Sequence, residues 1–580
     1  MARVTLSVPP LVARLLVARS GGPPPPPPRA EDRDEPDADR PSGWRYGIWL
    51  GLVALCLALY LPGLFSLPPI DRDESRFAQA TRQMIETGDF VEIRFQDEAR
   101  NKKPVGIHWA QAASAAVFGG SEAPIWAYRL PSVIGATAAV LLLFAGARRV
   151  TSDQTAAMAA SVFAASIGLV LEAHMAKTDA ALTAVTLAAQ LALARCWMGT
   201  ADRRVAWVFW VAQGLGILIK GPITPMISLL TVLALGLTSR RWRWLGALRP
   251  ATGVPIALAL VLPWMIAIWV ATDGQFFRDA IGNDLAPKIA GGGQPVHSGP
   301  PGYHLLWVMA GLFPGSLLLV PALVMAWRLR HEPLVWFLIA WVVPSWIVFE
   351  LAPNKLPHYV LPLYPALALL IARVAVDVPE ALGRLSTRIG IGVWALVALV
   401  FAAAMVALPL HVDDTFDWVS AIGVGAAVAG VVMVVMRVRR GEAIGALTTA
   451  IGLGVLLVSL ALQVVLPRVD GFWVSRSIEA MLSRNQVDRV AASGGFTEPS
   501  LVFLTQTDIR LGDGEQAAQA LITDPSARVL VESRHIDRFT NRLLAAGLEA
   551  RLIDQIQGFN YSQGRRVSVA LFERLDRRLP

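Results

Sequence analysis

The stretch IGIGVWALVALVFAAAMVAL, residues Ile389 to Leu408, contains no ionisable side chain. As a helix with a rise of about 1.5 Å per residue it is long enough to cross a hydrocarbon core of about 30 Å. Comparable segments recur along most of the chain, of which 54% is hydrophobic and 17% is charged; an ordinary soluble protein has about 25% charged residues. The sequence therefore excludes a soluble single domain and predicts an all-α polytopic membrane protein.

Windows of about 19 residues predict thirteen membrane-spanning helices. In chain order they lie near 46–65, 125–147, 154–171, 178–198, 205–219, 222–237, 251–271, 303–327, 333–349, 358–376, 389–408, 418–436 and 444–466. These spans define a transmembrane domain over 46–466. The segment 67–124 between the first two spans is a long extramembrane loop. No internal repeat is evident, which disfavours a transporter built from inverted halves.

The short loops on one side of these spans are rich in arginine. If the N-terminal tail is cytoplasmic, the inside loops hold Arg148, Arg149, Arg203, Arg204, Arg240, Arg241, Arg243, Arg249, Arg328, Arg330, Arg373, Arg384, Arg388, Arg437, Arg439 and Arg440. The outside loops hold fewer basic residues, namely Lys177, Lys220, Arg278, Lys288 and Lys355. The positive-inside rule then predicts a multi-pass protein of the cell inner membrane with a cytoplasmic N-terminus and a periplasmic C-terminal segment. Topology also explains the net charge of +8, so nucleic acid is not expected as a partner.

The two ends of the chain differ in composition from the spans. Residues 1–45 combine the run Pro23 to Pro28 with a dense charge cluster, which predicts a disordered cytoplasmic tail without a cleaved signal peptide. Residues 467–580 predict a small periplasmic α/β domain. Its expected helices are 475–485, 514–523 and 536–546, and its expected strands are 500–504, 528–532 and 566–572. Because Cys56 and Cys196 lie in or beside apolar spans, no disulfide framework is expected.

The extramembrane segment 67–124 opens with Asp73, Glu74 and Arg76 directly after the first span. Carboxylates at the mouth of a helical bundle can act as general bases, and an arginine can bind phosphate. The structural alternative is an ordinary helix start, with acidic residues in the first turn. The following residues, Phe77 to Ile85, have helical apolar spacing and end at Gly88, which predicts an amphipathic helix lying on the membrane surface.

Three further polar clusters fall at periplasmic span junctions. They are Glu172 to Asp179, Lys220-Gly221-Pro222, and Asn354 to Tyr359, which contains Lys355 and His358. Taken singly, Thr178 or Asp179 fits a helix cap and each lysine fits snorkelling toward the headgroups. Taken together, carboxylates, lysines and hydrogen-bonding rings at one membrane level predict a site for a phosphate-bearing amphiphile.

The periplasmic loop 272–302 is the second longest and contains Gly291-Gly292-Gly293 and His297. Glycine runs permit motion, so the sequence predicts a lid over the cavity; a solvated connector is the alternative. His297 has no second histidine or cysteine at ligand spacing, so it does not indicate a metal site.

An ordered series of short motifs resembles a known enzyme family. The motifs are Asp73-Glu74-Ser75-Arg76-Phe77, Thr87-Gly88-Asp89-Phe90, Lys103-Pro104-Val105-Gly106-Ile107-His108-Trp109, Phe118-Gly119, Tyr128-Arg129-Leu130-Pro131-Ser132, Lys177-Thr178-Asp179, Lys220-Gly221-Pro222 and Lys355-Leu356-Pro357-His358-Tyr359. In this order they resemble the GT-C glycosyltransferases related to the bacterial lipid A aminoarabinose transferases and, more distantly, the protein O-mannosyltransferases. The match covers about residues 46–370.

The resemblance implies a sugar donor linked to polyprenyl phosphate, used on the periplasmic face without a nucleotide or other cofactor. It implies that Asp73, with Glu74 beside it, and Asp179 are the catalytic carboxylates. Arg76, Lys103, Lys220, Lys355, His358 and Tyr359 would bind the donor phosphate and lipid. Two departures concern the local loop: Val105 replaces a second proline, and Ile107-His108 replace an aromatic residue before the tryptophan. The metal requirement stays open.

These observations predict a membrane glycosyltransferase that modifies lipid A or another envelope glycolipid or polysaccharide on the periplasmic face. The alternative among enzymes is a protein O-glycosyltransferase. A lipid or sugar transporter would need functional charges on both faces of the membrane, and a scaffold subunit would tolerate the loss of Asp73 and Lys103. The sequence does not identify the sugar or the acceptor.

Overall fold

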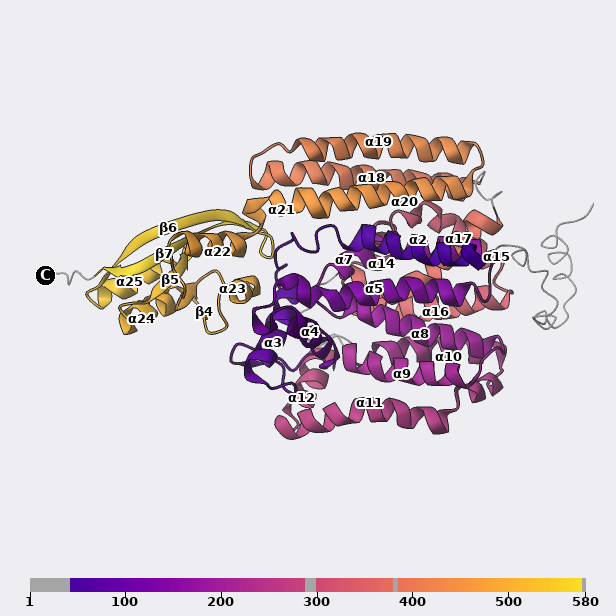
Figure 1. Ribbon diagram of the computed structural model, residues 1–580, viewed down its shortest axis with the longest axis horizontal. Coiled ribbons are helices and arrows are strands. Elements are labelled where there is room, and N and C mark those ends of the chain that lie inside the picture. Colours follow the sequence, from indigo (N-terminus) through magenta and orange to yellow (C-terminus); the bar gives the residue numbers. More distant parts are fainter. Residues whose placement is uncertain (1–41, 287–298, 379–383, 576–580) are drawn as a thin grey trace, which may run out of the picture. The chain divides into compact units, whose positions relative to one another are not determined.

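The computed structural model describes residues 42–286, 299–378 and 384–575, and most of them lie in long helices that run side by side (Figure 1). The long helices are α2 (Ser42–Tyr60), α5 (Ile125–Ala147), α6 (Asp153–Ala165), α8 (Asp179–Trp197), α9 (Arg203–Lys220), α10 (Ile223–Ser239), α11 (Pro250–Ala271), α16 (Pro333–Leu351), α17 (Tyr364–Asp377), α18 (Leu385–Val412), α19 (Trp418–Arg439) and α20 (Ala443–Leu460). Shorter helical pieces join them: α7 (Ile167–Ala173), η3 (Arg243–Leu248), α12 (Gln275–Phe277), η4 (Arg278–Leu285), α14 (Tyr303–Gly311), η5 (Gly315–Leu318), α15 (Leu319–Arg328), η6 (Pro357–Leu363), η8 (Ala461–Val465) and α21 (Leu466–Arg468). The predicted disordered tail lies almost entirely outside the described residues.

Each of the thirteen predicted spans coincides with one of these helices or with two or three consecutive pieces. Within the described ranges, eight helices are long and apolar enough to cross a membrane, or ten if each bent pair counts as one span. The helices Trp44–Tyr60 and Ile223–Ser239 are apolar but shorter. The chain is thus a multi-pass membrane protein, and the exact number of crossings stays a prediction.

Two of the spans are broken, and their breaks lie against each other. α6 and α7 meet at Ser166 with a bend of 59°, and the pair Tyr303–Gly311 and Gly315–Arg328 bends by 118°. The backbone amide of Ile167 donates a hydrogen bond of 3.0 Å to the carbonyl of Phe313, so each break satisfies a backbone group of the other. This pairing matters because an unpaired backbone group inside a membrane is costly.

The segment between the first two spans forms two helices, α3 (Asp73–Thr87) and α4 (Gly106–Val117), with the hairpin β1 (Arg94–Phe95) and β2 (Glu98–Ala99) and the turn η2 (Gly120–Glu122). The prediction of an amphipathic helix ending at Gly88 is confirmed. Gly88 adopts a left-handed φ of 73° at the C-cap, and its amide bonds the Met84 carbonyl, as helix-terminating glycines commonly do.

The C-terminal segment forms a five-stranded sheet in the order β4-β3-β5-β7-β6, flanked by helices. The strands are β3 (Ala492–Gly494), β4 (Arg510–Gly512), β5 (Arg528–Glu532), β6 (Glu549–Asn560) and β7 (Arg565–Leu575), and the helical elements are η9 (Asp470–Phe472), α22 (Val474–Arg484), α23 (Pro499–Leu504), α24 (Gly514–Thr523), η10 (Ser533–His535) and α25 (Ile536–Ala545). Strand β3 pairs in parallel with β4 and β5, whereas β7 pairs antiparallel with β5 and β6. The α/β character is confirmed, and the boundary at 466/467 stays a prediction.

One element of this domain was predicted wrongly. Residues 500–504 were expected as a strand, but they belong to the helix α23. A short apolar run does not distinguish a strand from a buried helix by periodicity, and Pro499 at the first helical position favours the helix. The long strand β6 was not predicted.

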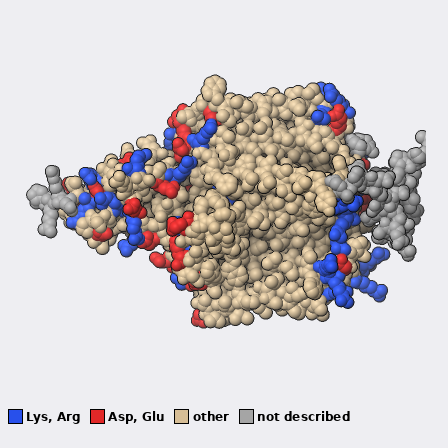
Figure 2. All heavy atoms as spheres, in the orientation of Figure 1, with Lys and Arg blue, Asp and Glu red and all other residues tan. Residues whose placement is uncertain are grey.

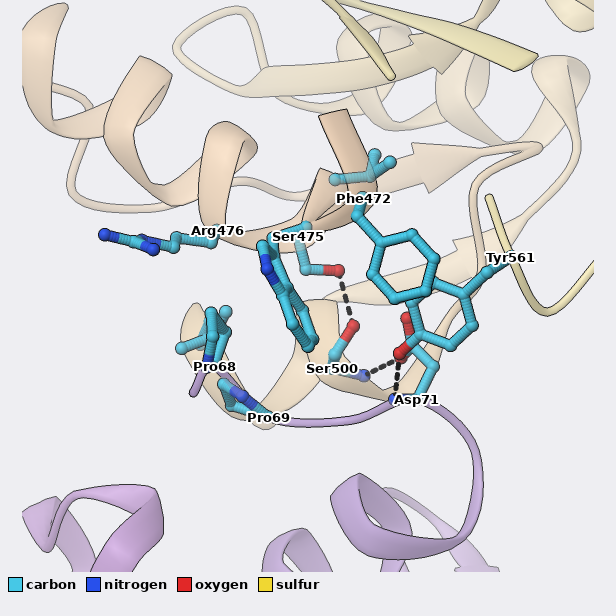
Figure 3. A pocket seen from close by; sticks show the side chains of 11 residues that line it. Pro68, Pro69, Asp71, Phe472, Ser475, Arg476, Ser500 and Tyr561 are labelled. Carbon is cyan, nitrogen blue, oxygen red and sulfur yellow. Dashed lines mark hydrogen bonds between the residues drawn. The ribbon is translucent and has the colours of Figure 1, made fainter. Parts of the chain in front are cut away.

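The C-terminal domain is hydrogen-bonded to the loop that follows the first span (Figure 3). The amide of Asp71 donates to Tyr561 Oη at 2.5 Å, and Asp71 Oδ1 accepts from the amide of Ser500 at 2.9 Å. Phe472 stacks on the Tyr561 ring at 4.4 Å. These contacts border a small pocket that Pro68 and Pro69 also line.

The charged side chains are unevenly distributed over the surface. In Figure 2, lysines and arginines gather at one end of the helical bundle, acidic side chains dominate the opposite end, and the surface between them is largely uncharged. The connections after α5, α8 and α10, together with the first turns of α9 and η3, hold exposed Arg149, Arg203, Arg204, Arg240, Arg241, Arg243 and Arg249. An uncharged belt between two charged ends is what a bilayer requires.

Candidate active site at the ends of four spans

Four chain segments bring ionisable side chains to one place at the end of the bundle opposite the arginine-rich loops. α7 contributes Glu172, the turn before α8 contributes Lys177, α8 begins with Asp179, and α9 ends with Lys220. The first turn of η6 adds His358. We call these five residues the charge cluster. The sequence placed them at span junctions, and the fold brings the junctions together.

Asp179 and Lys220 form the shortest contact of the charge cluster. Lys220 Nζ donates to Asp179 Oδ1 at 2.5 Å, and the Thr178 hydroxyl donates to Asp179 Oδ2 at 3.2 Å. Thr178 makes no side-chain cap hydrogen bond, so its hydroxyl serves the carboxylate and not the helix end. Lys220 Nζ also lies 5.7 Å from the centre of the Tyr359 ring, over its face, a position that stabilises a cation.

Glu172 and Lys177 form a second pair, and His358 lies between the two pairs. Lys177 Nζ lies 2.9 Å from Glu172 Oε1. His358 Nδ1 is 3.7 Å from that same oxygen, and its Nε2 is 3.9 Å from Asp179 Oδ1. Every charge in the cluster therefore has an opposite charge beside it, as buried charges need.

Electrostatics ties Lys177 to Asp73 as well. Burial lowers the pKa of Lys177, but the negative charges of Glu172 and Asp179 outweigh it, with a further contribution from Asp73, and hold the pKa above its ordinary value. Lys177 therefore keeps its positive charge in a buried position. A permanent cation beside carboxylates at the end of the bundle is suited to bind a phosphate.

The remaining predicted site residues belong to α3, the loop before α4 and the segment before η6. Asp73 and Arg76 are exposed in the first turns of α3. Lys103 is partly buried just before α4, whose first residue, Gly106, lies so close to the backbone of Leu218 that a Cβ would meet it at 2.8 Å. Leu218 lies two residues before Lys220, so this packing holds the Lys103 loop beside the end of α9. Lys355 Nζ donates to the Gly299 carbonyl at 3.2 Å.

No group of three or more His, Cys, Asp or Glu side chains that could hold a metal ion occurs among the residues that the structure describes. The glycine run and His297 of the expected lid loop lie outside those residues.

The chain is similar to proteins of known function. Residues 102–269 match the family model described as dolichyl-phosphate-mannose-protein mannosyltransferase. The undecaprenyl phosphate-α-4-amino-4-deoxy-L-arabinose arabinosyl transferase of Pseudomonas paraeruginosa is 31% identical over 383 residues, which cover 62% of this chain and 67% of that protein. The chain belongs to this arabinosyl transferase family. The Pseudomonas aeruginosa member is 30% identical over the same shares.

The fold agrees with membership of the arabinosyl transferase family. The crystal structure of ArnT from Cupriavidus metallidurans bound to undecaprenyl phosphate superposes with a TM-score of 0.71, at 20% identity, over 91% of this chain and 98% of that chain. The superposition confirms the predicted GT-C glycosyltransferase fold with a C-terminal α/β domain. As a member of the arabinosyl transferase family, the chain is a membrane glycosyltransferase.

Glu74 has a position in this transferase that the sequence did not indicate. Its two carboxylate oxygens bind Arg129 Nε and Nη2, each at 2.8 Å, and both side chains are fully buried. The same oxygens accept the backbone amides of Ile70 and Ala176 at 2.8 Å. Because Glu74 is engaged on all sides, we propose that it organises the site, in place of the catalytic role suggested by its neighbour Asp73.

Several participants in the site were missed by sequence reasoning. Glu172 and Lys177 lie in the motif that flagged Asp179, but neither was chosen as a site residue. His304 packs behind the His358 motif: its Nδ1 lies 3.2 Å from Glu350 Oε2 and its Nε2 lies 3.2 Å from the Leu356 carbonyl. The signal that could have identified Arg129 and Glu350 is an ionisable residue within an apolar span.

Proposed function

We propose that this glycosyltransferase moves a sugar from a polyprenyl-phosphate-linked donor to lipid A, or to another envelope glycolipid, at the periplasmic ends of its spans. The observation that carries the proposal is the buried charge cluster of lysines and carboxylates where α7 and α9 end and α8 and η6 begin. Its relatives named as undecaprenyl phosphate-aminoarabinose transferases support a donor that combines a lipid, a phosphate and an amino sugar.

In the transfer, the bond between the anomeric carbon and the donor phosphate oxygen breaks, and the polyprenyl phosphate leaves with the electron pair. An acceptor oxygen forms the new bond to the anomeric carbon. The negative charge that grows on the leaving phosphate needs fixed cations in a water-poor place. We assign this stabilisation to Lys103, Lys177 and Lys220, with Arg76 at the entrance.

The carboxylates have two tasks in this proposal. Asp73 is exposed and lies within the electrostatic reach of Lys177, so it orients the acceptor or takes the proton of an acceptor hydroxyl. Asp179 holds Lys220 in position, and Glu172 holds Lys177. The two carboxylates also provide negative charge that can bind the cationic amine of an amino sugar. A phosphate acceptor carries no proton at neutral pH that must be removed, and for such an acceptor Asp73 acts by orientation alone.

A transfer assay tests the assignment. Purified protein in detergent receives radiolabelled polyprenyl-phosphate sugar and envelope lipid, and Asp73→Asn and Lys103→Ala are compared with the neighbouring exposed controls Asp97→Asn and Lys102→Ala. We expect label in extractable glycolipid with wild type and both controls and a loss of at least about a hundredfold in the two site variants. Equal labelling by all variants would overturn the site assignment.

The product of the same assay separates two enzyme classes. The family model that matches residues 102–269 is described for a protein mannosyltransferase. If the label stays with protein after lipid extraction, the acceptor is a protein and not a lipid.

We also propose that the N-terminus is cytoplasmic and that residues 467–580 lie in the periplasm. The arginine-rich end of the bundle supports this orientation. A single introduced cysteine at Ser526 in the Cys56→Ser, Cys196→Ser background should react with a membrane-impermeant maleimide in intact spheroplasts. A cysteine that replaces Ser239 should react only after lysis, and the reverse pattern would refute the orientation.

A further inference from the structure

A second hollow lies at the arginine-rich end of the bundle, away from the charge cluster. It has a volume of about 360 Å³ and lies between α5, α8, α9, α16 and α17. Its walls are largely apolar and include Leu142, Leu334, Phe337, Trp341 and Leu369. We call this hollow the inner groove. The reaction proposed above uses the beginning of α8, whereas the inner groove is lined by the second half of α8 from Ala188 on and by Met198 directly after it.

The inner groove contains polar atoms that have no partner. Gln190 is 0% exposed, and neither its amide nitrogen nor its amide oxygen has a hydrogen-bond partner within the described chain. The indole nitrogen of Trp341, also in the groove wall, is likewise buried without a hydrogen-bond partner in the described part of the chain. By contrast, the buried Gln213 on α9 donates to Ser228 at 2.8 Å. An unsatisfied buried amide costs about 1–3 kcal/mol. A bound molecule that forms hydrogen bonds with the Gln190 side chain would remove this cost and bind more tightly.

The mouth of the inner groove is basic. Arg149, Arg195 and Arg204 line it together with one carboxylate, that of Asp202. Arg195 Nη2 lies 3.6 Å from Asp202 Oδ2 and donates to the Thr200 carbonyl at 2.7 Å, while Arg204 is exposed. Guanidinium groups outnumber the carboxylate, so the mouth is complementary to an anion. Figure 2 shows that lysines and arginines gather at this end of the bundle.

We propose that the inner groove binds one anionic glycerophospholipid from the leaflet next to the arginine-rich loops. The phosphate would meet Arg195 and Arg204, an acyl chain would lie against the apolar walls, and the acyl ester would reach Gln190. Gln190 precedes Arg195 by five residues, about 7.5 Å of helix rise, a separation that matches the few bonds between phosphate and ester in such a lipid. Basic pockets between membrane helices are suited to lipid headgroups.

The proposal is tested by measuring lipid binding directly. The delipidated full-length protein in a neutral detergent is titrated with phosphatidylglycerol or phosphatidylcholine, and bound lipid is counted by native mass spectrometry. We expect one phosphatidylglycerol to bind at least about tenfold more tightly than phosphatidylcholine. Arg204→Gln and Gln190→Leu should each weaken phosphatidylglycerol binding by about tenfold. Arg203→Gln, exposed and adjacent but outside the groove, should leave it unchanged.

Three results would overturn the proposal. Equal affinity for the two phospholipids would mean that the mouth does not select an anion. An effect of Arg203→Gln as large as that of Arg204→Gln would mean a diffuse charge effect without a defined site. Stronger binding of undecaprenyl phosphate than of phosphatidylglycerol, sensitive to Gln190→Leu, would assign the groove to a polyprenyl lipid.

Discussion

Glu74 and Arg129, which are 55 positions apart in the sequence, form a two-pronged ion pair with no solvent exposure on either side chain. Arg129 also donates to the backbone carbonyls of Leu64, Leu67 and Pro68 at 2.8–3.2 Å. One guanidinium therefore joins the end of the first span, the start of α3 and the second span. Because Glu74 also binds the amide of Ala176, the same pair supports the loop that carries Lys177.

Loss of this pair should destabilise the whole periplasmic end of the bundle. Removing one partner of a buried ion pair leaves an uncompensated charge, which costs about 3–5 kcal/mol. We expect Arg129→Ala to lower the thermal unfolding midpoint in detergent sharply. Arg129→Lys should lower it less than Arg129→Ala but not restore the wild-type midpoint, because the lysine ammonium cannot form the two parallel hydrogen bonds of the guanidinium. Arg94→Gln, which removes a half-exposed pair with Glu92, should change the midpoint little.

Removal of the charge on Asp179 should affect catalysis more than stability. Asp179→Asn leaves Lys220 without its 2.5 Å carboxylate partner but keeps the size of the side chain. We expect the turnover number to fall by at least about a hundredfold. The melting temperature should fall less than in Arg129→Ala, because the Lys220 side chain is 14% exposed and keeps its position over the Tyr359 ring. Transfer assays and thermal scans on the same preparation check this, and an unchanged turnover number would remove Asp179 from the site.

The contact between Asp71 and the C-terminal domain should depend on pH. Burial raises the pKa of Asp71 to about 6, with a further increase from Glu498 and an opposing effect of Ser500. Because the folded state favours the neutral acid, its stabilising contribution is complete below the ordinary pKa of 3.8 and disappears as the pH rises through about 6. We expect limited proteolysis near residues 467–475 to increase over that interval.

Asp71→Asn should remove this pH dependence. The side-chain amide keeps an acceptor for the Ser500 backbone amide and has no charge to desolvate. At neutral pH we therefore expect the domain of the variant to be more stable than that of wild type by about 1–2 kcal/mol. Its resistance to proteolysis should be the same at neutral pH and at pH 5. Asp488→Asn, an exposed change on the same domain, provides the control. If the Asp71 variant kept the wild-type pH profile, another group would be responsible.

His108 should make the α3–α4 unit sensitive to acid. Burial, and secondarily Arg100, lowers the pKa of His108 to about 3, and its Nδ1 lies 2.8 Å from the Thr81 hydroxyl. The neutral ring contributes stability above its ordinary pKa of 6.5, and this stability is lost as the pH falls toward 3. We expect the amide protection factors in α3 and α4, which correct for the intrinsic pH dependence of exchange, to fall between pH 6.5 and pH 4 in wild type.

His108→Gln should weaken this acid response, because glutamine does not acquire a charge in that range. At neutral pH the variant should be less stable by about 1–2 kcal/mol, since Phe77 stacks on the imidazole ring at 5.2 Å and the amide replaces that contact poorly. His331→Gln, on the arginine-rich side of the bundle, should leave exchange in α3 and α4 unchanged at every pH.

The positions of the spans, the amphipathic α3 with its stop at Gly88, and the series of motifs around Asp73, Lys103, Asp179, Lys220 and Lys355 were all predictable from the sequence alone. Their signals are local: an apolar run of sufficient length is a span wherever it occurs, and a glycine after an amphipathic stretch ends a helix. The same local reasoning failed at residues 500–504, because the short apolar run Leu501 to Leu504 fits a buried strand and a buried helix equally well.

Tertiary structure alone decided how those residues are used. The neighbours Asp73 and Glu74 appear as one acidic pair in the sequence, yet Asp73 is exposed and Glu74 is buried on Arg129. One cluster forms from Glu172, Lys177, Asp179, Lys220 and His358 only because two elements end and two begin at the same level. A buried charge must be balanced by whichever opposite charge the packing brings within a few ångströms, and that partner is set by the three-dimensional arrangement of the helices and not by distance along the chain.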